Sequence, residues 1–254
     1  MPETIYDKML RVRNEKGAGF IVLIDPDKLA PEHLPAFAEM CARAGVDFLF
    51  VGGSLMHATE LEAYIRRIKE VSDLPVIGFP GSLTQICPSL DAVLYLSVIS
   101  GRNPEYLIGQ HVMGAPIIRR LKIEPISTGY MLVESGSLTT ALYMNHSLPL
   151  PRKKPDVAAA TALAAEMMGM RLLYTDGGSG AEQSVPEPMI EAITETCTIP
   201  LIVGGGLSSP IEVQRKVESG AGFIVVGNAI ERRPDLSFIT ELAAAAHVAV
   251  PRSY

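Results

Sequence analysis

Three stretches decide the fold: RLLYTDGG (171–178), IPLIVGGG (199–206) and GFIVVGN (222–228). Each is a short aliphatic run that ends in a glycine-containing turn. Five further aliphatic runs precede them, and most of these end in Gly or Asp. These five are FIVLID (20–25), DFLFVGG (47–53), PVIGFPG (75–81), AVLYLSV (92–98) and EPISTGYMLV (124–133). Continuous apolar runs without alternation are typical of parallel strands that are buried on both faces.

Helical patterns separate most of these runs, for example ATELEAYIRRIKEVS (58–72) and PIEVQRKVESG (210–220). Thr59 with Glu62, and Ser209 with Glu212, have the spacing of capping boxes at helix starts. Eight strands alternating with helices over 254 residues predict an α/β protein, a (β/α)8 TIM barrel forming a single domain over residues 1–254. An open doubly wound sheet is the alternative, but eight strand–helix units make closure the simpler account.

The composition excludes several classes of protein. With 48% hydrophobic and 20% charged residues the chain is not disordered, and its net charge of −6 argues against binding nucleic acid. No apolar run approaches the roughly 20 residues of a membrane-spanning helix, and no secretory signal is visible at the start. Three scattered cysteines form neither a disulfide framework nor a metal knuckle, so we expect buried thiols. We therefore expect a soluble, cytoplasmic protein.

The connection 134–155 is unusually long for a strand-to-helix loop. A connection of this length is usually functional or carries a short helix of its own. A solvated loop is the alternative.

Three glycine-rich turns follow the last three predicted strands: GGSG (177–180), GGG (204–206) and GN (227–228). Glycine lets backbone N–H groups converge on an anion because no Cβ stands in the way, and a helix beginning near Asn228 would direct its positive end to the same place. Tight turns need glycine anyway, so each turn alone has that simpler explanation. Three of them on adjacent strands favour a phosphate cradle at the barrel mouth.

The first two predicted strands are followed by acidic and hydroxyl side chains, in the segments DPDK (25–28) and GGS (52–54). The carboxylate of Asp25 beside the hydroxyl of Ser54 suits Mg²⁺, which favours oxygen ligands and keeps several waters. Two protein ligands hold such an ion poorly, so a diphosphate substrate would complete its shell. Spacing alone equally allows Asp25 and Asp27 to cap the next segment and pair with Lys28.

Tyr174 and Asp176 lie two positions apart on the sixth strand, so both side chains point to one side of it. If that side is the barrel mouth, Asp176 is placed to orient or deprotonate a substrate hydroxyl. The alternative is a carboxylate that only accepts hydrogen bonds from loop amides. The five histidines show no spacing typical of a metal site.

Taken together, these motifs resemble the geranylgeranylglyceryl phosphate synthase family, over about residues 5–245. The segment ISGRNPEYLIGQHV (99–112) resembles the larger archaeal and bacterial subgroup of that family. The motifs that carry the resemblance are LIDPDK (23–28), VGGS (51–54), PVIGFPGS (75–82), YTDGGSGA (174–181), VGGG (203–206) and VGN (226–228).

The resemblance implies a Mg²⁺-dependent prenyltransferase that joins sn-glycerol 1-phosphate to geranylgeranyl diphosphate, forming the first ether bond of archaeal-type lipids. It implies a magnesium site at Asp25 and Ser54, and we expect catalysis by Asp176 and Tyr174. Many members of the family have Glu where this chain has Asp176, whose shorter side chain reaches less far. The residues expected to hold glycerol 1-phosphate are Tyr174, Thr175, Asp176, Gly177, Gly178, Ser179, Gly180, Gly205, Gly206, Gly227 and Asn228.

A prenyl chain needs an apolar trough beside this site, and Tyr106 is our candidate for the residue that limits chain length. The aromatic residues expected to line the trough are Phe79, Tyr95, Tyr106, Tyr130 and Tyr143. The resemblance also implies a homo-oligomer. A lipid-like product implies transient contact with a membrane.

Two other functions remain open on the sequence. A phosphate-binding isomerase or lyase of sugar or amino-acid biosynthesis would use the same cradle without Mg²⁺ or an apolar trough. A non-catalytic barrel that binds phosphorylated ligands or serves as a scaffold would have no use for the acid and hydroxyl at 25 and 54.

Overall fold

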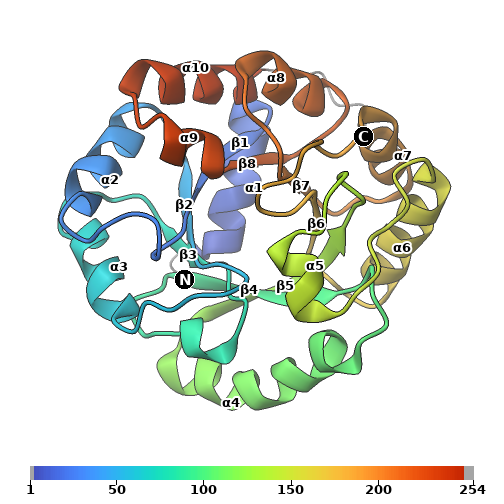
Figure 1. The fold of residues 1–254 in the computed structure, drawn as a ribbon, viewed down its shortest axis with the longest axis horizontal. Coiled ribbons are helices and arrows are strands. Elements are labelled where there is room, and N and C mark those ends of the chain that lie inside the picture. The colour runs from blue at the N-terminus through green and yellow to red at the C-terminus, as the bar shows by residue number, and fades with distance from the viewer. Residues whose placement is uncertain (1–2, 249–254) are drawn as a thin grey trace.

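The computed structural model describes residues 3–248 and has a closed barrel of eight parallel strands in the order β1 to β8 (Figure 1). β8 pairs with β1 to close it, with Ile21 opposite Val225. This confirms the predicted (β/α)8 barrel and excludes the open sheet. The strands are β1 Gly19–Ile24, β2 Phe48–Val51, β3 Val76–Gly78, β4 Ala92–Val98, β5 Glu124–Leu132, β6 Leu172–Asp176, β7 Leu201–Gly204 and β8 Phe223–Val226.

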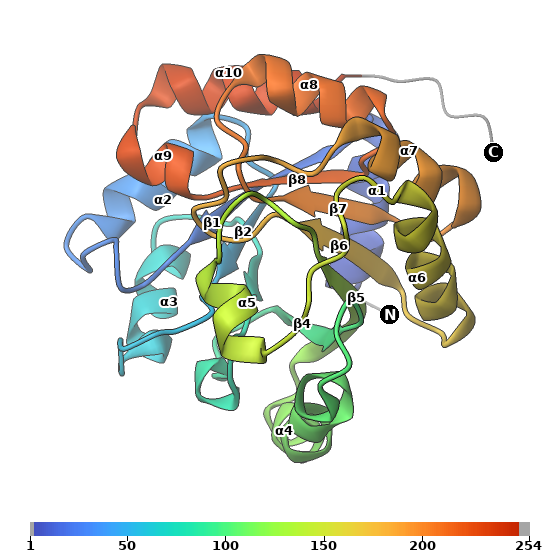
Figure 2. The same ribbon diagram turned by 45° about the vertical axis from the view of Figure 1, so that its right-hand side comes forward.

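The larger helices form a ring outside the strands (Figures 1 and 2), as expected when each crossover packs back onto the sheet. A 3-10 turn, η1 (Leu83–Gln85), and a π-helical turn, η2 (Glu105–Gly109), interrupt the pattern after β3 and β4. The helices are α1 Ile5–Lys16, α2 Leu34–Arg43, α3 Leu61–Lys69, α4 Gln110–Leu121, α5 Thr140–Asn145, α6 Pro155–Met167, α7 Glu187–Thr196, α8 Pro210–Glu218, α9 Asn228–Arg232 and α10 Leu236–Ala246.

Of the two predicted capping boxes, one forms. The Ser209 hydroxyl accepts from the Glu212 amide at 3.4 Å, and α8 begins with a proline directly after it. The prediction at Thr59 is wrong, since α3 begins at Leu61 with Glu60 as an N-cap that makes no side-chain hydrogen bond. The apolar face of α3 therefore decides where this helix starts, through buried residues such as Ile65 and Ile68.

The core has two layers, one inside the barrel and one between the strands and the helices. Inside the barrel, Phe48 and Phe223 are fully buried and meet edge to face with centroids 6.4 Å apart. Burying a side chain of this size stabilises the fold by about 2–3 kcal/mol. The outer layer is mainly aliphatic, and all three cysteines are buried free thiols, as predicted.

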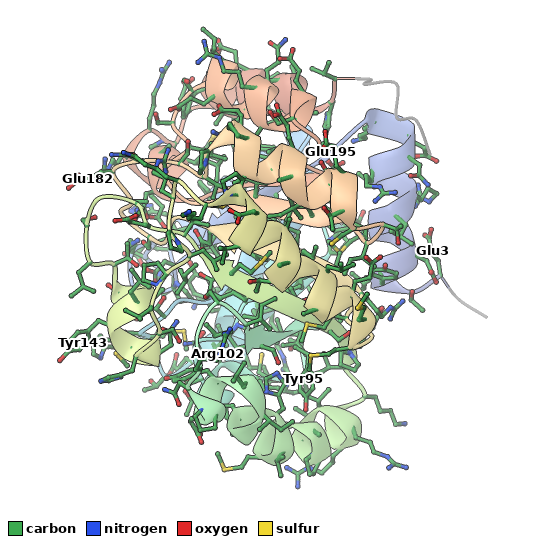
Figure 3. All side chains as sticks on the ribbon, turned by 90° about the vertical axis from the view of Figure 1, so that its right-hand side faces the viewer. Glu3, Tyr95, Arg102, Tyr143, Glu182 and Glu195 are labelled. Atoms are coloured by element: carbon green, nitrogen blue, oxygen red, sulfur yellow. The ribbon has the colours of Figure 1, made fainter. Side chains whose placement is uncertain are left out.

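Helix α1 covers the end of the barrel where the strands begin. The Glu124 carboxylate at the start of β5 accepts the amides of Ile5 at 2.6 Å and Tyr6 at 3.2 Å, which satisfies two donors at the helix start. Figure 3 shows α1 on the opposite side of the molecule from Glu182, in the loop after β6, and from Tyr143, in α5 of the connection after β5. The end where strands finish is therefore left for a site.

At the closed end, the carboxylate of Asp47 joins segments that are distant in sequence. It contacts Lys16 Nζ at 2.6 Å and His247 Nε2 at 2.8 Å, and it accepts the Phe20 amide at 2.8 Å. Burial alone would raise the pKa of Asp47, but these hydrogen bonds hold it below its ordinary value.

Across residues 3–248 no helix is long and apolar enough to cross a bilayer.

Candidate functional site

A cavity of about 670 Å³ opens where the strands end, and loops after β1, β2, β6, β7 and β8 line it. It contains the predicted acid, the predicted hydroxyl and residues of all three glycine turns. The predicted site residues that line it are Asp25, Ser54, Tyr174, Asp176, Gly178, Ser179, Gly180, Gly205, Gly206, Gly227 and Asn228.

Two predicted contacts, Thr175 and Gly177, do not line the cavity. The side chain of Thr175 alternates to the outer face of β6, where it is fully buried and its hydroxyl donates to the Ile202 carbonyl at 3.4 Å. The Gly177 amide donates to the Gly204 carbonyl at 3.2 Å, so it is used in joining β6 to β7. Neither group is available to a ligand in the cavity.

The glycine turn after β7 needs glycine for both conformation and space. Gly205 and Gly206 have φ of 78° and 72°, a region that side-chain-bearing residues rarely adopt. A Cβ on Gly205 would also stand 2.6 Å from the Gly177 nitrogen and 2.7 Å from the Gly178 nitrogen. Within residues 3–248 the amides of Gly205 and Gly206 donate to no protein acceptor, so they are free to bind an anion.

Helix α9 begins at Asn228 as expected, but it has only five residues. The positive end of a helix comes from many aligned peptide dipoles, so one turn contributes little. The anion-binding capacity of this wall therefore depends on the loop amides and on side chains. Asn228 itself lies within hydrogen-bond distance of Ser179, 3.4–3.5 Å between their side chains.

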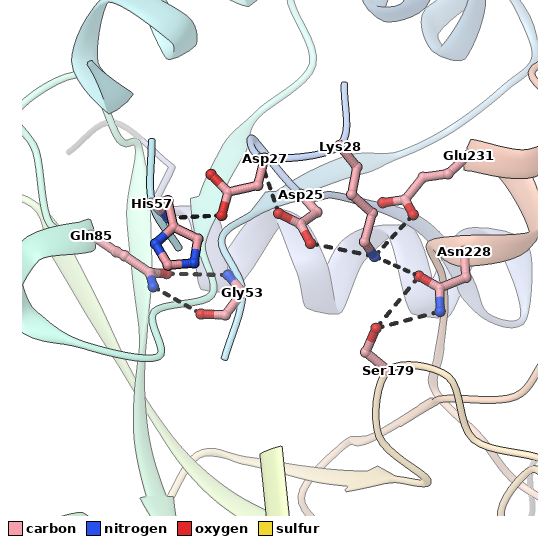
Figure 4. A network of polar contacts seen from close by, with 9 residues as sticks. All are labelled: Asp25, Asp27, Lys28, Gly53, His57, Gln85, Ser179, Asn228 and Glu231. Carbon is pink, nitrogen blue, oxygen red and sulfur yellow. Dashed lines mark hydrogen bonds and ion pairs between the residues drawn. The ribbon is translucent and has the colours of Figure 1, made fainter. Parts of the chain in front are cut away.

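The DPDK segment divides its roles between its two acids (Figure 4). Asp25 faces the cavity with its side chain 20% exposed, and its Oδ2 lies 3.3 Å from Lys28 Nζ. Asp27 instead accepts the amides of His57 and Ala58, both at 2.7 Å, and so fixes the loop after β2. Asp27 therefore braces the loop after β2 and does not cap its own segment. The capping and pairing alternative holds for Asp25, whose Oδ1 accepts the Asp27 amide at 3.1 Å and whose Oδ2 pairs with Lys28, although this carboxylate also lines the cavity.

Gln85 positions the residue before Ser54, and no sequence pattern pointed to it. Its side chain is 2% exposed, its amide donates to the Gly53 carbonyl at 2.8 Å, and its carbonyl accepts the Gly53 and Gly81 amides at 3.2 Å. A buried amide with all these partners ties the loops after β2 and β3 together. Its contacts with Gly53 (Figure 4) thereby hold the next residue, Ser54, at the cavity wall.

Asp176 points into the barrel mouth, with its two oxygens held separately. Oδ2 accepts the Tyr130 hydroxyl at 2.6 Å and Oδ1 accepts the Gly178 amide at 2.7 Å. Burial raises the pKa of Asp176, although both hydrogen bonds oppose the rise. A carboxylate with a raised pKa is a stronger base than a solvated one, which suits it to accept a proton.

Tyr174 packs in the same wall. Its ring stacks on Phe79 with centroids 5.3 Å apart and meets Tyr130 edge to face at 5.3 Å. Its hydroxyl has no hydrogen-bond partner among residues 3–248, and Tyr174 lines the cavity. This hydroxyl is therefore free to contact a bound substrate.

A second, narrow and mostly apolar cavity of about 110 Å³ lies between β4, η1 and α4. It shares wall residues with the large cavity, so the two meet at Phe79 and Tyr130. Of the aromatic residues expected in an apolar trough, Phe79, Tyr95, Tyr106 and Tyr130 line it. The expectation for Tyr143 is wrong, because this side chain lines neither cavity and is 66% exposed at the edge of the molecule (Figure 3).

The long connection after β5 carries a helix of its own, α5, rather than a solvated loop. An isolated bridge between Val133 and Leu150 closes its base. Ala141 of α5 lines both cavities, and the Tyr106 hydroxyl donates to the Met144 carbonyl at 3.2 Å, joining η2 to α5. The connection is thus part of the site wall.

A model of the PcrB family matches residues 10–246. The chain belongs to the PcrB family. Two named relatives are geranylgeranylglyceryl phosphate synthases: one from Chitinophaga pinensis, 43% identical over 251 residues and 99% of each chain, and one from Thermococcus gammatolerans, 44% identical over 227 residues and 89% of each chain. The family resemblance of the sequence motifs is therefore confirmed.

A comparison with solved structures also finds similarity between this PcrB-family chain and a geranylgeranylglyceryl phosphate synthase. It is similar to (S)-3-O-geranylgeranylglyceryl phosphate synthase from Thermoplasma acidophilum in complex with its substrate sn-glycerol-1-phosphate, with a TM-score of 0.91, 32% identity and coverage of 96% of this chain and 98% of that one. Thiamine phosphate pyrophosphorylase from Pyrococcus furiosus, at 14% identity and a TM-score of 0.60, shares the fold alone.

Proposed function

We propose that this PcrB-family protein is a geranylgeranylglyceryl phosphate synthase, a prenyltransferase that joins sn-glycerol 1-phosphate to geranylgeranyl diphosphate in the synthesis of ether lipids. The similarity to named synthases over nearly the whole chain supports this, as does a similar structure that binds sn-glycerol-1-phosphate. The observation that carries the proposal is the junction of two unlike cavities at Phe79 and Tyr130, one polar and lined by glycine turns, the other apolar. An isomerase of phosphorylated sugars has no need of the second cavity.

The donor set supports a requirement for Mg²⁺. Asp25 and Ser54 offer a carboxylate and a hydroxyl at one rim of the cavity, and hard cations prefer such oxygen ligands. Residues 3–248 contain no group of three or more His, Cys, Asp or Glu that could hold an ion unaided, so we propose that the substrate diphosphate completes the shell. When bound there, the ion would neutralise the departing diphosphate.

On the opposite wall, we assign the proton transfer to Asp176. The hydroxyl oxygen of glycerol 1-phosphate forms a bond to C1 of the prenyl chain, the bond from C1 to the diphosphate breaks, and the hydroxyl proton passes to an oxygen of Asp176. Tyr130 and Gly178 hold that carboxylate in one orientation, and the Tyr174 hydroxyl positions the glycerol. Rate enhancement then comes largely from the proximity of two oriented substrates.

The narrow cavity is our candidate for the prenyl chain. Its walls are mostly aliphatic and aromatic, and Tyr106 stands in one of them, anchored by its hydroxyl to the Met144 carbonyl. A bulky, anchored ring is well suited to stop a chain. We therefore retain Tyr106 as the residue that limits chain length.

The site of action and the assembly state also belong to the proposal. We propose a cytoplasmic enzyme that contacts membranes only transiently and forms a homo-oligomer through its outer helices. Val112 and Met113 on α4 are 66% and 53% exposed, which supports association through that helix. Light scattering after size exclusion would reveal a monomer if this is wrong.

The decisive assay incubates the purified chain with radiolabelled sn-glycerol 1-phosphate and prenyl diphosphates of graded length, with and without Mg²⁺. We expect a lipid-soluble labelled product only with Mg²⁺ and with the highest rate for the geranylgeranyl chain. Tyr106→Ala should extend the product range to longer chains. Absence of product with every prenyl diphosphate would refute the proposed synthase.

A further inference from the structure

Lys28 lies at the junction of the two halves of the large cavity (Figure 4). Its Nζ is 3.3 Å from Asp25 Oδ2, 2.9 Å from Asn228 Oδ1 and 3.1 Å from Glu231 Oε2. Asp25 belongs to the half proposed for the cation, and Asn228 belongs to the half proposed for glycerol phosphate. A single ammonium group therefore contacts both substrate sites.

The ammonium is charged and able to move. The carboxylates of Glu231 and Asp25 lie 3.1 and 3.3 Å from Nζ and both favour its positive charge. Its side chain is 43% exposed, so Nζ can change partners without disturbing the core. The backbone stays fixed meanwhile, since the Lys28 amide donates to the Asp25 carbonyl at 3.0 Å.

The observed pairing cannot persist with both ligands in place. A divalent cation on Asp25 would stand close to the ammonium, and the two positive charges would repel each other. On the other side, a phosphate beside Asn228 would approach the carboxylate of Glu231, and a cation between them would reduce that repulsion. Both changes move Lys28 in the same direction, away from Asp25 and toward the phosphate.

We propose that Lys28 is a movable cation that pairs with Asp25 when the metal is absent and turns to the phosphate of glycerol 1-phosphate when the metal binds. The inference rests on the proposed function, which places a cation at Asp25 and a phosphate beside Asn228. By linkage, metal diphosphate and glycerol 1-phosphate then strengthen each other's binding by the same factor. Lys28 thus couples the two substrate sites.

Calorimetry of sn-glycerol 1-phosphate binding measures this coupling without turnover. In the wild-type protein we expect Mg²⁺ with inorganic diphosphate to tighten binding about tenfold, within the usual range for coupled sites. In Lys28→Met the same addition should leave the affinity unchanged. Without the Lys28 ammonium, Asp25 no longer has a cation that competes with the metal. Lys28→Met should therefore bind Mn²⁺ with diphosphate more tightly than the wild type does, as measured by electron paramagnetic resonance.

Arg232→Met is the matched control, because Arg232 lines the same cavity but makes no ion pair with Asp25. We expect it to keep the metal-dependent ratio, and thermal unfolding should show both variants folded. If Mg²⁺ with diphosphate tightened glycerol 1-phosphate binding equally in Lys28→Met and in the wild type, the coupling role of Lys28 would be refuted, while the proposed function would stand. A wild-type protein that gave no heat with glycerol 1-phosphate would instead contradict the proposed function.

Discussion

Gly205→Ala is expected to abolish the phosphate cradle while Gly180→Ala preserves it. Both glycines lie at the cavity and have similar positive φ, 78° and 80°. An added Cβ meets nothing within 4 Å at Gly180, whereas at Gly205 it meets the amide nitrogens of Gly177 and Gly178 and Oδ1 of Asp176. Both variants therefore strain the backbone alike, and only Gly205→Ala also places a methyl group against neighbouring atoms.

The expected magnitudes follow from these contacts. A left-handed backbone costs an alanine about 1–2 kcal/mol, and this applies to both variants. At Gly205 the neighbouring loop must also move, because the Cβ would be 2.6 Å from the Gly177 nitrogen. Losing even one amide hydrogen bond to a charged phosphate costs about 1.5–3 kcal/mol, which is about 10- to 150-fold in Kd.

Calorimetric titration with sn-glycerol 1-phosphate gives the Kd of each variant, and urea unfolding gives the stability. We expect Gly180→Ala to lose about 1 kcal/mol of stability with less than about a threefold change in Kd. Gly205→Ala should lose more stability and at least about tenfold in affinity. Equal loss of affinity in the two variants, or none in Gly205→Ala, would refute the cradle.

Three further predictions test other parts of the molecule. Asp25→Ala should abolish turnover in the radiolabel assay while calorimetry still detects glycerol 1-phosphate binding; unchanged turnover would contradict the metal assignment. Tyr130→Phe removes a hydrogen bond that stabilises ionised Asp176, so its pKa should rise and the acid limb of kcat/KM should move to higher pH; Tyr174→Phe, which makes no such bond, should lower the rate without moving that limb. Because the folded-state pKa of Asp47 is lowered, its contribution is complete above the unfolded pKa of about 3.9 and is lost as pH falls through the folded value. Asp47→Asn should therefore lower the free energy of unfolding in urea at pH 7 by about 3 kcal/mol, and the variant should lose less stability than the wild type on acidification. If the free energy of unfolding depended on pH equally in both proteins, Asp47 would not be the group responsible.

Local sequence was enough to predict the barrel, because each strand is a continuous apolar run and each run ends in a turn. β4, for example, spans the predicted residues 92–98. The capping prediction at Thr59 is wrong because packing of the apolar face of α3 overrode a local side-chain signal. The position of Tyr143 was mispredicted for a similar reason, since an aromatic residue in a long loop carries no periodicity that says which way it faces.

The candidate site was predictable where function depends on backbone chemistry. Glycine turns and an acid at strand ends are local patterns, and parallel strands in a barrel place their ends together whatever the remaining contacts are. Gln85 could not be found in this way, because its role depends on the loop amides it meets only in the folded chain. The same applies to the hydrogen bond between Tyr130 and Asp176, which joins residues 46 positions apart.

The amino-acid sequence by itself determined which segments form strands and which turns end them, because those depend on neighbours along the chain. Only the tertiary structure decided which side chains share a cavity and which groups pair across it. Lys28 illustrates the difference: sequence placed it three residues from Asp25, but only closure of β8 onto β1 brought Glu231, 203 positions away, within 3.1 Å of its ammonium. Electrostatic and hydrogen-bond energies depend on distance in space, and the sequence does not contain that distance.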